Sequence, residues 1–304
     1  MRRIANLIFM GIFLNMVNYF QGSLKAQELE KPLQIKSKHI DATVAVLYSG
    51  SMVALHQLWY KDYGSSKFHF FNDAGEWKGM DKVGHFVTAN RVNSGIYAMY
   101  TASGFSPQRA MWRSAIISTA FQTTVEVFDG FSTAWGFSWA DIASNTAGTA
   151  AFCLQQQFFK EQLVKFKFSF WPSKFNKYRP SLLGQSFPNT LLKDYNAQTY
   201  WASFSLARAT GFSKLPAWLC LSFGYGVNAL TGARVNSSID GLLPPSNELR
   251  ASEFSLGIDI DLVKIKTRHR WLRRCFNVVN IIRLPLPAVT YLSTGTTKFN
   301  FIKF

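Results

Sequence analysis

The sequence predicts an α+β protein in which a hydrophobic helical bundle precedes a β-rich, basic C-terminal part. Long apolar stretches separated by short capping signals fill residues 27–160, and four such helices with short loops make a bundle. After Lys160, Lys and Phe alternate with the period of two that is typical of a half-buried strand. The charge changes at the same point. Residues 27–160 carry 11 Lys and Arg against 10 Asp and Glu, whereas residues 161–304 carry 19 against 7, a net charge of +12.

Residues 1–26 have the organisation of a secretory signal peptide. Arg2 and Arg3 form a basic start, residues 4–20 are mostly apolar, and Ala26 supplies a small residue at the expected cleavage point. An uncleaved membrane anchor is the alternative. No Cys follows the cleavage point, so we do not expect the lipid attachment of a lipoprotein. The three cysteines of the chain are scattered and predict neither a zinc site nor a disulfide framework.

Four helices are predicted in residues 27–160. The first is expected over residues 42–60, which contain no Lys, Arg, Asp or Glu. The second is expected to begin near Asp73, because Asp73 and Glu76 have capping-box spacing. The others are expected to begin at Ser106 and Ser138, each a good N-cap. Only the first and fourth helices approach the roughly 20 apolar residues that crossing a bilayer needs, so membrane spanning stays open. The expected ends of the last three helices are Ser103, Phe128 and Phe159.

Residues 161–304 are predicted to form strands with one amphipathic helix among them. Strands are expected over residues 165–170, 199–206, 219–225, 254–263 and 298–302. Residues 266–282 interrupt this pattern by mixing four arginines between Arg268 and Arg274 with Trp271 and aliphatic side chains. A helix of this composition suits an anionic membrane surface, and a helix that covers a sheet with its charges in water is the alternative.

The basic C-terminal half indicates an anionic partner. In an exported protein this partner is expected to be a membrane, through anionic lipid or lipopolysaccharide phosphates. The export signal argues against nucleic acid, and protein partners stay open. The location predicted is the periplasm or the outer membrane, with membrane association.

Three predicted helices each carry a polar stripe on one face. Asp81, Lys82 and His85 share the second helix, Gln122, Glu126 and Asp129 the third, and Asp141 and Asn145 the fourth. Charged groups on apolar helices are costly unless they meet each other or water. We therefore predict that the three stripes turn inward into one site. Its candidate catalytic residues are Asp81, Lys82, His85, Glu126, Asp129, Asp141 and Asn145.

Such a site allows several chemistries. His85 is a candidate general base, oriented by Asp81 or by Glu126, and Lys82 is suited to hold a phosphate or to stabilise an oxyanion. Carboxylates with a His also suit a divalent metal. No motif selects among these, so cofactor and metal stay open. Structural readings are also open: Asp141 as a helix cap, Asp81 and Lys82 as a solvent pair, and Asn145 as a bridge between helices.

The spaced motif resembles a known family. The segments that carry the resemblance are Trp77-Lys-Gly-Met-Asp-Lys-Val-Gly-His-Phe86, Gln122 with Glu126, and Asp129 through Gly148 with Asp141 and Asn145. They resemble the YfiM-type predicted periplasmic lipoproteins, which have no established function, and the order of polar residues is similar to VanZ-like membrane proteins. The resemblance covers about residues 40–160. The C-terminal half resembles the long versions found in Bacteroidetes-type bacteria, through residues 193–201 and 259–262.

Two functional hypotheses follow from the sequence. In the first, the polar cluster binds or modifies a lipid-linked or phosphate-bearing envelope molecule. In the second, the protein is a non-catalytic structural or assembly factor of the outer membrane, and the cluster only fixes helix packing. Whether His85 is accessible or sealed distinguishes the two.

Overall fold

The computed structural model describes residues 37–60, 63–212, 214–236, 244 and 248–304, so the predicted signal peptide lies outside the described residues. Helices in the N-terminal part and a six-stranded antiparallel sheet in the C-terminal part confirm the α+β prediction. The chain divides into two compact units. Of the described residues, the helical unit contains those in 37–73, 85–162 and 269–278, and the sheet unit contains those in 74–84, 163–268 and 279–304.

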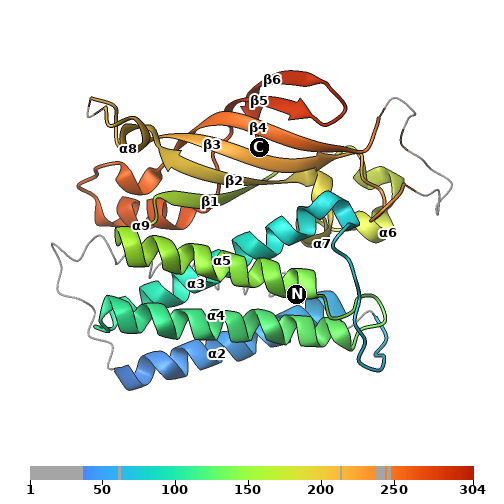
Figure 1. Cartoon of the computed structure of the whole chain (residues 1–304), viewed down its shortest axis with the longest axis horizontal. Coiled ribbons are helices and arrows are strands. Elements are labelled where there is room, and N and C mark those ends of the chain that lie inside the picture. The colour runs from blue at the N-terminus through green and yellow to red at the C-terminus, as the bar shows by residue number, and fades with distance from the viewer. Residues whose placement is uncertain (1–36, 61–62, 213, 237–243, 245–247) are drawn as a thin grey trace. The chain divides into compact units, whose positions relative to one another are not determined.

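Four long helices make up most of the helical unit. They are α2 (Ser37–Leu55), which continues as a π-helical turn (His56–Tyr60), α3 (Met80–Ala102), α4 (Pro107–Gly130) and α5 (Trp139–Phe159). Figure 1 shows α2, α4 and α5 running alongside one another. All four helices contribute to one buried apolar cluster, which includes Ile40, Val92, Tyr100, Met111 and Phe152. Among the described residues, no helix combines the length and hydropathy that crossing a membrane requires.

Two predicted helix starts were wrong. α2 begins at Ser37, five residues before Ala42, because the charge of Asp41 is accommodated by Arg113 (3.0 Å) and by the Tyr100 hydroxyl (2.7 Å). α3 begins at Met80 rather than near Asp73, because Trp77, Lys78 and Gly79 all have positive φ and interrupt a helix there.

The other two helix starts were predicted correctly. The Ser106 hydroxyl accepts a hydrogen bond from the Arg109 amide (3.4 Å), and Pro107 occupies the first turn of α4. The Ser138 hydroxyl accepts from the Asp141 amide (3.1 Å) at the start of α5. These caps fix where α4 and α5 begin, and therefore which of their residues share a face.

The sheet is a meander in which each strand pairs with the next. Its strands are β1 (Val164–Phe170), β2 (Gln198–Ser205), β3 (Leu219–Asn228), β4 (Ala251–Ile260), β5 (Leu286–Leu292) and β6 (Thr297–Lys303), in that order across the sheet. Five of these match predicted strands. β5 was missed because Pro285 and Pro287 resemble a link. Pro287 is tolerated beside a register shift between Leu286 and Ala288, where the ladder to β6 is irregular.

Short helices connect the strands. They are α6 (Pro180–Leu183), α7 (Phe187–Lys193) and α8 (Leu206–Thr210). The amphipathic helix predicted over residues 266–282 is present as α9, but it is limited to Arg270–Val279.

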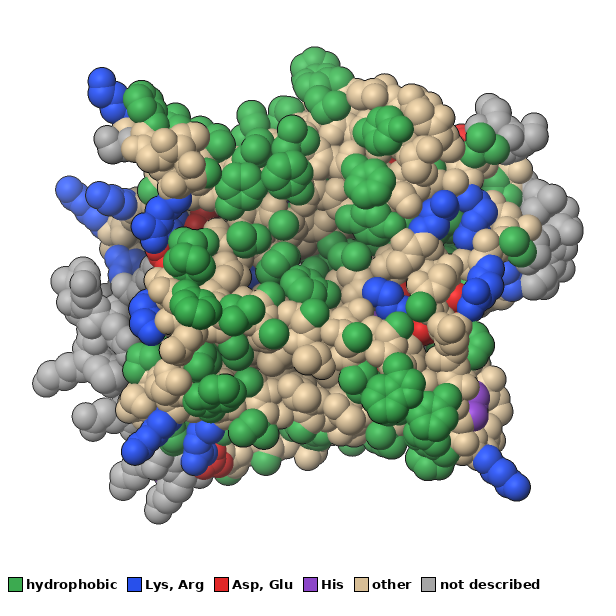
Figure 2. Space-filling view, viewed as in Figure 1, with side chains coloured by type: hydrophobic (Ala, Val, Ile, Leu, Met, Phe, Trp, Pro, Cys, Tyr) green, Lys and Arg blue, Asp and Glu red, His purple; other side chains and the backbone are tan. Residues whose placement is uncertain are grey.

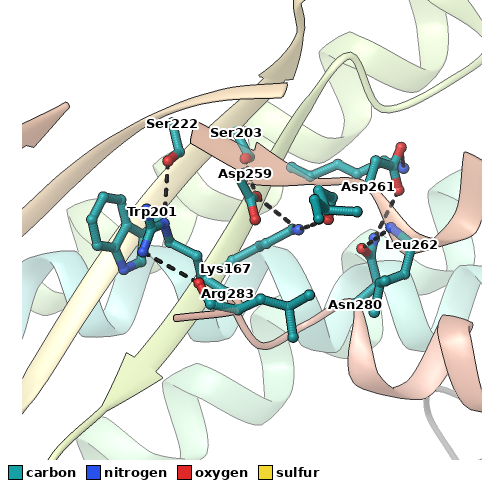
Figure 3. A network of polar contacts seen from close by, with 12 residues as sticks. Lys167, Trp201, Ser203, Ser222, Asp259, Asp261, Leu262, Asn280 and Arg283 are labelled. Carbon is teal, nitrogen blue, oxygen red and sulfur yellow. Dashed lines mark hydrogen bonds and ion pairs between the residues drawn. The ribbon is translucent and has the colours of Figure 1, made fainter. Parts of the chain in front are cut away.

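One face of the sheet is polar and buried. Lys167 on β1 reaches the Asp259 carboxylate on β4 at 2.8 Å, and the side chains of both are at most 1% exposed (Figure 3). The Lys167 ammonium also donates to the Ile260 carbonyl (2.8 Å), and the Ser203 hydroxyl donates to Asp259. A buried ion pair needs additional hydrogen bonds of this kind to offset its desolvation.

Arg283 occupies the same face. Its guanidinium lies 3.8 Å from the ring centroid of Trp201, and it donates to the Lys303 carbonyl (2.7 Å) and the Ile258 carbonyl (3.0 Å). Burial lowers the pKa of Arg283 to about 10, although the charge of Asp259 acts in the opposite direction. Room for the indole comes from Gly224, where a Cβ atom would lie 2.6 Å from the Trp201 ring. Polar and cationic groups thus fill the space that an apolar core usually occupies.

Candidate functional site

His85 lies in the second turn of α3 and is the centre of a polar cluster in the helical unit. Its Nδ1 atom is 3.2 Å from the Asn145 side-chain oxygen and 3.4 Å from the Glu126 carboxylate. Its Nε2 atom is 3.6 Å from the Asp141 carboxylate. The His85 side chain is 21% exposed. Both ring nitrogens therefore face acceptors, while part of the ring stays in contact with solvent.

Glu126 is the most buried member of the cluster. It lies in the body of α4, and its side chain is 1% exposed. Besides His85, it contacts the Asn145 amide, whose Nδ2 atom donates to it at 3.4 Å. The expected contact of Glu126 with His85 or with a polar residue on the fourth helix is therefore present. Asn145 bridges His85 and Glu126, and it orients both.

Asp141 has two separable roles at the start of α5. Its backbone amide is capped by Ser138, whose hydroxyl also donates to the Asp73 carboxylate (2.6 Å). Its side chain, 6% exposed, is directed to His85 instead of serving as the cap. Capping alone therefore does not explain this carboxylate.

Close helix packing brings these side chains together. A Cβ atom on Gly148 would lie 2.1 Å from the Phe86 carbonyl oxygen, so α3 and α5 approach as closely as only glycine allows. The Asn90 amide donates to the Gly148 carbonyl (3.1 Å), and the Ser118 hydroxyl donates to the Ala89 carbonyl (3.2 Å). These contacts hold α4 and α5 against the helix that carries His85.

Asp81 and Lys82 lie in the first turn of α3, which belongs to the sheet unit. The Lys82 ammonium is 2.9 Å from the Asp81 carboxylate, and the Tyr195 hydroxyl donates to Asp81 at 2.7 Å. Tyr200 is buried, and its pKa is raised first by burial and then by the charge of Asp81. Asp81 and Lys82 do pair with each other, but their side chains are only 23% and 14% exposed, so this is not a fully solvated pair. Asp81 precedes His85 by one helical turn and shares its face of α3.

Asp129 accepts a hydrogen bond from the Tyr60 hydroxyl (2.8 Å) in the π-helical turn after α2. Burial raises the pKa of Tyr60, and the charges of Asp129 and, more weakly, Glu126 raise it further. Tyr60 therefore lies close to both Asp129 and Glu126 of α4.

Tyr60 and Tyr195 were missed by sequence reasoning as site residues, and Asp73 was assigned only as a helix cap. Tyr60 ends an apolar helix, and Tyr195 lies more than a hundred positions after Asp81 in the chain. Neither has a spacing signal that predicts its partner. A single-turn π-helix often occurs at functional sites, but it is visible only in the structure.

The cluster combines an imidazole with acids of different burial. A His held between carboxylates can accept and return a proton, and imidazole with carboxylates also suits a divalent cation. Proton transfer and cation binding are two chemistries that this set of side chains can support.

Residues 69–157 match the model of a family described as "Predicted periplasmic lipoprotein (DUF2279)". The matched range contains every candidate site residue, from Asp81 to Asn145. The match supports an exported, periplasmic envelope protein of uncharacterised function. The comparisons with curated proteins and with solved structures returned no match. The YfiM-type and VanZ-like resemblances stay predictions.

Proposed function

We propose that the His85 cluster binds, and transfers protons to and from, a lipid-linked or phosphate-bearing molecule of the cell envelope. The observation that carries this proposal is the 21% exposure of His85 beside two carboxylates that are 1% and 6% exposed. A group that exchanges protons with a ligand needs both an accessible ring and fixed partners. Asp81, Lys82 and Asp129 complete the proposed set of site residues.

The charge of the cluster restricts how an anionic ligand can bind. With Glu126 and Asp141 ionised, these two side chains and His85 carry a net negative charge even when the imidazole is protonated. A phosphate therefore requires a cation nearby. Lys82, three residues before His85 on α3, is one source, and a divalent cation bound by the imidazole and carboxylates is another.

A binding assay tests this proposal. We expect isothermal titration calorimetry to detect polyprenyl phosphate in detergent micelles, and Lys82→Gln to weaken its binding by about tenfold, the loss of one charge-assisted contact. Lys67→Gln, which neutralises an exposed lysine outside the cluster, is the matched control. Adding Mn²⁺ or Zn²⁺ distinguishes the two cation sources. The proposal would be contradicted if substitution of Lys82, substitution of His85 and addition of metal all left binding of the polyprenyl phosphate unchanged.

The alternative is a structural or assembly factor of the outer membrane, in which the cluster only locks three helices together. The contacts of Asn145 with both His85 and Glu126 favour it, because they join α3, α4 and α5. Under this alternative, every substitution that abolishes function also lowers thermal stability.

We further propose that the segment around α9 contacts an anionic membrane surface. Trp271 is 64% exposed, Arg268 and Arg274 are exposed, and anionic headgroups attract such Arg–aromatic segments.

For this segment, Arg268→Glu with Arg274→Glu is expected to reduce co-sedimentation with phosphatidylglycerol vesicles by about tenfold at low salt. High salt is expected to weaken binding of the unmodified protein, because ions screen surface attraction. Lys67→Glu with Arg109→Glu makes the same charge change at exposed positions elsewhere and serves as control. Equal binding by both double variants would count against a role for α9.

A further inference from the structure

The sheet exposes an apolar row on the face opposite its buried polar network. Phe223 pairs with Leu256, Leu256 with Val289, and Val289 with Phe299, so one continuous row crosses β3, β4, β5 and β6. Their exposures are 53%, 45%, 43% and 59%. Figure 2 shows hydrophobic side chains gathered over the area that these strands occupy in Figure 1.

The neighbouring positions of this face are apolar as well. Phe254 and Tyr291 form a second cross-strand pair and are 50% and 47% exposed, and Ile258 is 47% exposed. The residues that alternate with them on β3 to β5 point to the other side, and Ser222, Ser255 and Thr290 among them are at most 4% exposed. An antiparallel sheet with one face in water normally has the opposite polarity, with apolar side chains buried and polar ones outside.

This inverted polarity restricts what can cover the face. On β3 to β6 the outward positions hold no Lys, Arg, Asp or Glu, and the carboxylates of Asp259 and Asp261 are buried against Lys167 and Lys165. A protein partner usually meets polar and charged side chains in addition to apolar ones. Acyl chains require no hydrogen bonds, and strands that face lipid show this alternation of apolar outside and polar inside.

Charge at one end of the sheet favours an anionic bilayer. The connection from β2 to β3, which contains α8, exposes Arg208 and Lys214 together with Phe212 (55%) and Trp218 (36%). Figure 2 shows Lys and Arg side chains at this end, where α8 lies in Figure 1. Aromatic rings with basic residues beside an apolar surface are typical of a membrane interface.

We infer that the exposed apolar part of the outer face of β3 to β6, from Phe223 to Phe299, lies against the acyl region of an anionic lipid bilayer, with Arg208 and Lys214 at the headgroups. The end of β3 is covered instead by Met80, which packs against Val227. This surface is separate from the His85 cluster, and the inference does not depend on the chemistry proposed there. It places the sheet unit at the membrane through its sheet, in addition to any contact made by α9.

Vesicle flotation tests the inference. The purified full-length protein is expected to float with vesicles of phosphatidylethanolamine and phosphatidylglycerol. Leu256→Lys with Val289→Lys is expected to reduce the floating fraction by about tenfold or more, because lysine is costly among acyl chains. Both positions are nearly half exposed, so circular dichroism should show an unchanged fold. Val46→Lys, at a 71% exposed position of α2, is the matched control and is expected to float like the unmodified protein.

Each other outcome overturns the inference. In the first, the unmodified protein does not float. In the second, the sheet variant and Val46→Lys lose flotation equally. A third outcome is that the unmodified protein is a dimer by light scattering, the sheet variant is a monomer, and both float alike, which would assign the face to a second copy of the chain. Glu126→Gln is expected to float normally, so failure of this inference is distinguishable from failure of the His85 proposal.

Discussion

Glu126→Gln is expected to abolish complementation of a deletion strain while the protein folds normally. The amide keeps the size of the side chain and can still accept the Asn145 hydrogen bond (3.4 Å), but it removes the negative charge 3.4 Å from His85. General acid–base catalysis contributes a factor of about 10² to 10⁴ to a reaction rate, and this factor is at risk when the group that orients the base is lost. The measurement is growth of the complemented strain, with protein abundance by immunoblot and the melting temperature of the purified variant.

Two controls separate a chemical site from a structural lock. Asp41→Asn makes the same carboxylate-to-amide change at a position that is 51% exposed, and it is expected to complement fully. Gly148→Ala forces a Cβ atom against the Phe86 carbonyl oxygen and is expected to lose function because it loses stability. If Glu126→Gln unfolds like Gly148→Ala, with a loss of about 3–5 kcal/mol typical of a broken buried pair, the cluster is a structural lock.

Lys167→Met is expected to destabilise the sheet unit by about 3–5 kcal/mol, because it leaves the Asp259 carboxylate buried without its cation. Asp259→Leu is expected to lower the free energy of unfolding by a similar amount, because it leaves the Lys167 ammonium buried without its anion. The double variant should recover most of the loss, since replacing a whole buried pair by apolar side chains is often neutral. Urea denaturation of the three variants gives the coupling free energy.

The neighbouring pair of Lys165 and Asp261 supplies the matched control. The Lys165 side chain is 17% exposed, and Asp261 also accepts a hydrogen bond from the Asn280 amide (3.1 Å), so Lys165→Met is expected to cost less than Lys167→Met. Single variants at Lys167 and Asp259 that stay within about 1 kcal/mol of the unmodified protein would contradict a tightly coupled buried pair.

Local sequence signals predicted which segments are helical better than they predicted where those helices begin. Ser106 and Ser138 were correct as N-caps because the capping hydroxyl and the amide that it binds are three residues apart in sequence. Asp73 failed because its carboxylate is used by Ser138, 65 residues later, while positive φ at Trp77 and Lys78 delays α3. No pattern in a short window reports such competition.

The two polar clusters of the protein differ in how far the sequence predicts them. His85, Glu126 and Asp141 were found from sequence because helical spacing placed each on one face, and a charge on an apolar helix requires partners. The network of Lys167, Asp259 and Arg283 was not predicted. Its members come from separate parts of the chain, and the register of the strands that joins them is set by long-range pairing.

The two units exchange segments along the chain, and this affects the order in which an exported protein can fold. Residues 269–278 complete the helical unit, but residues 163–268, which precede them, belong to the sheet unit. At about 5–20 residues per second of synthesis, α2 to α5 wait on the order of 5 to 20 s for this last segment. During that time their apolar surfaces stay incompletely covered, which favours aggregation. A premature stop codon before residue 268 would leave both units incomplete, so truncated products should be cleared by proteolysis and should not persist as a working helical half.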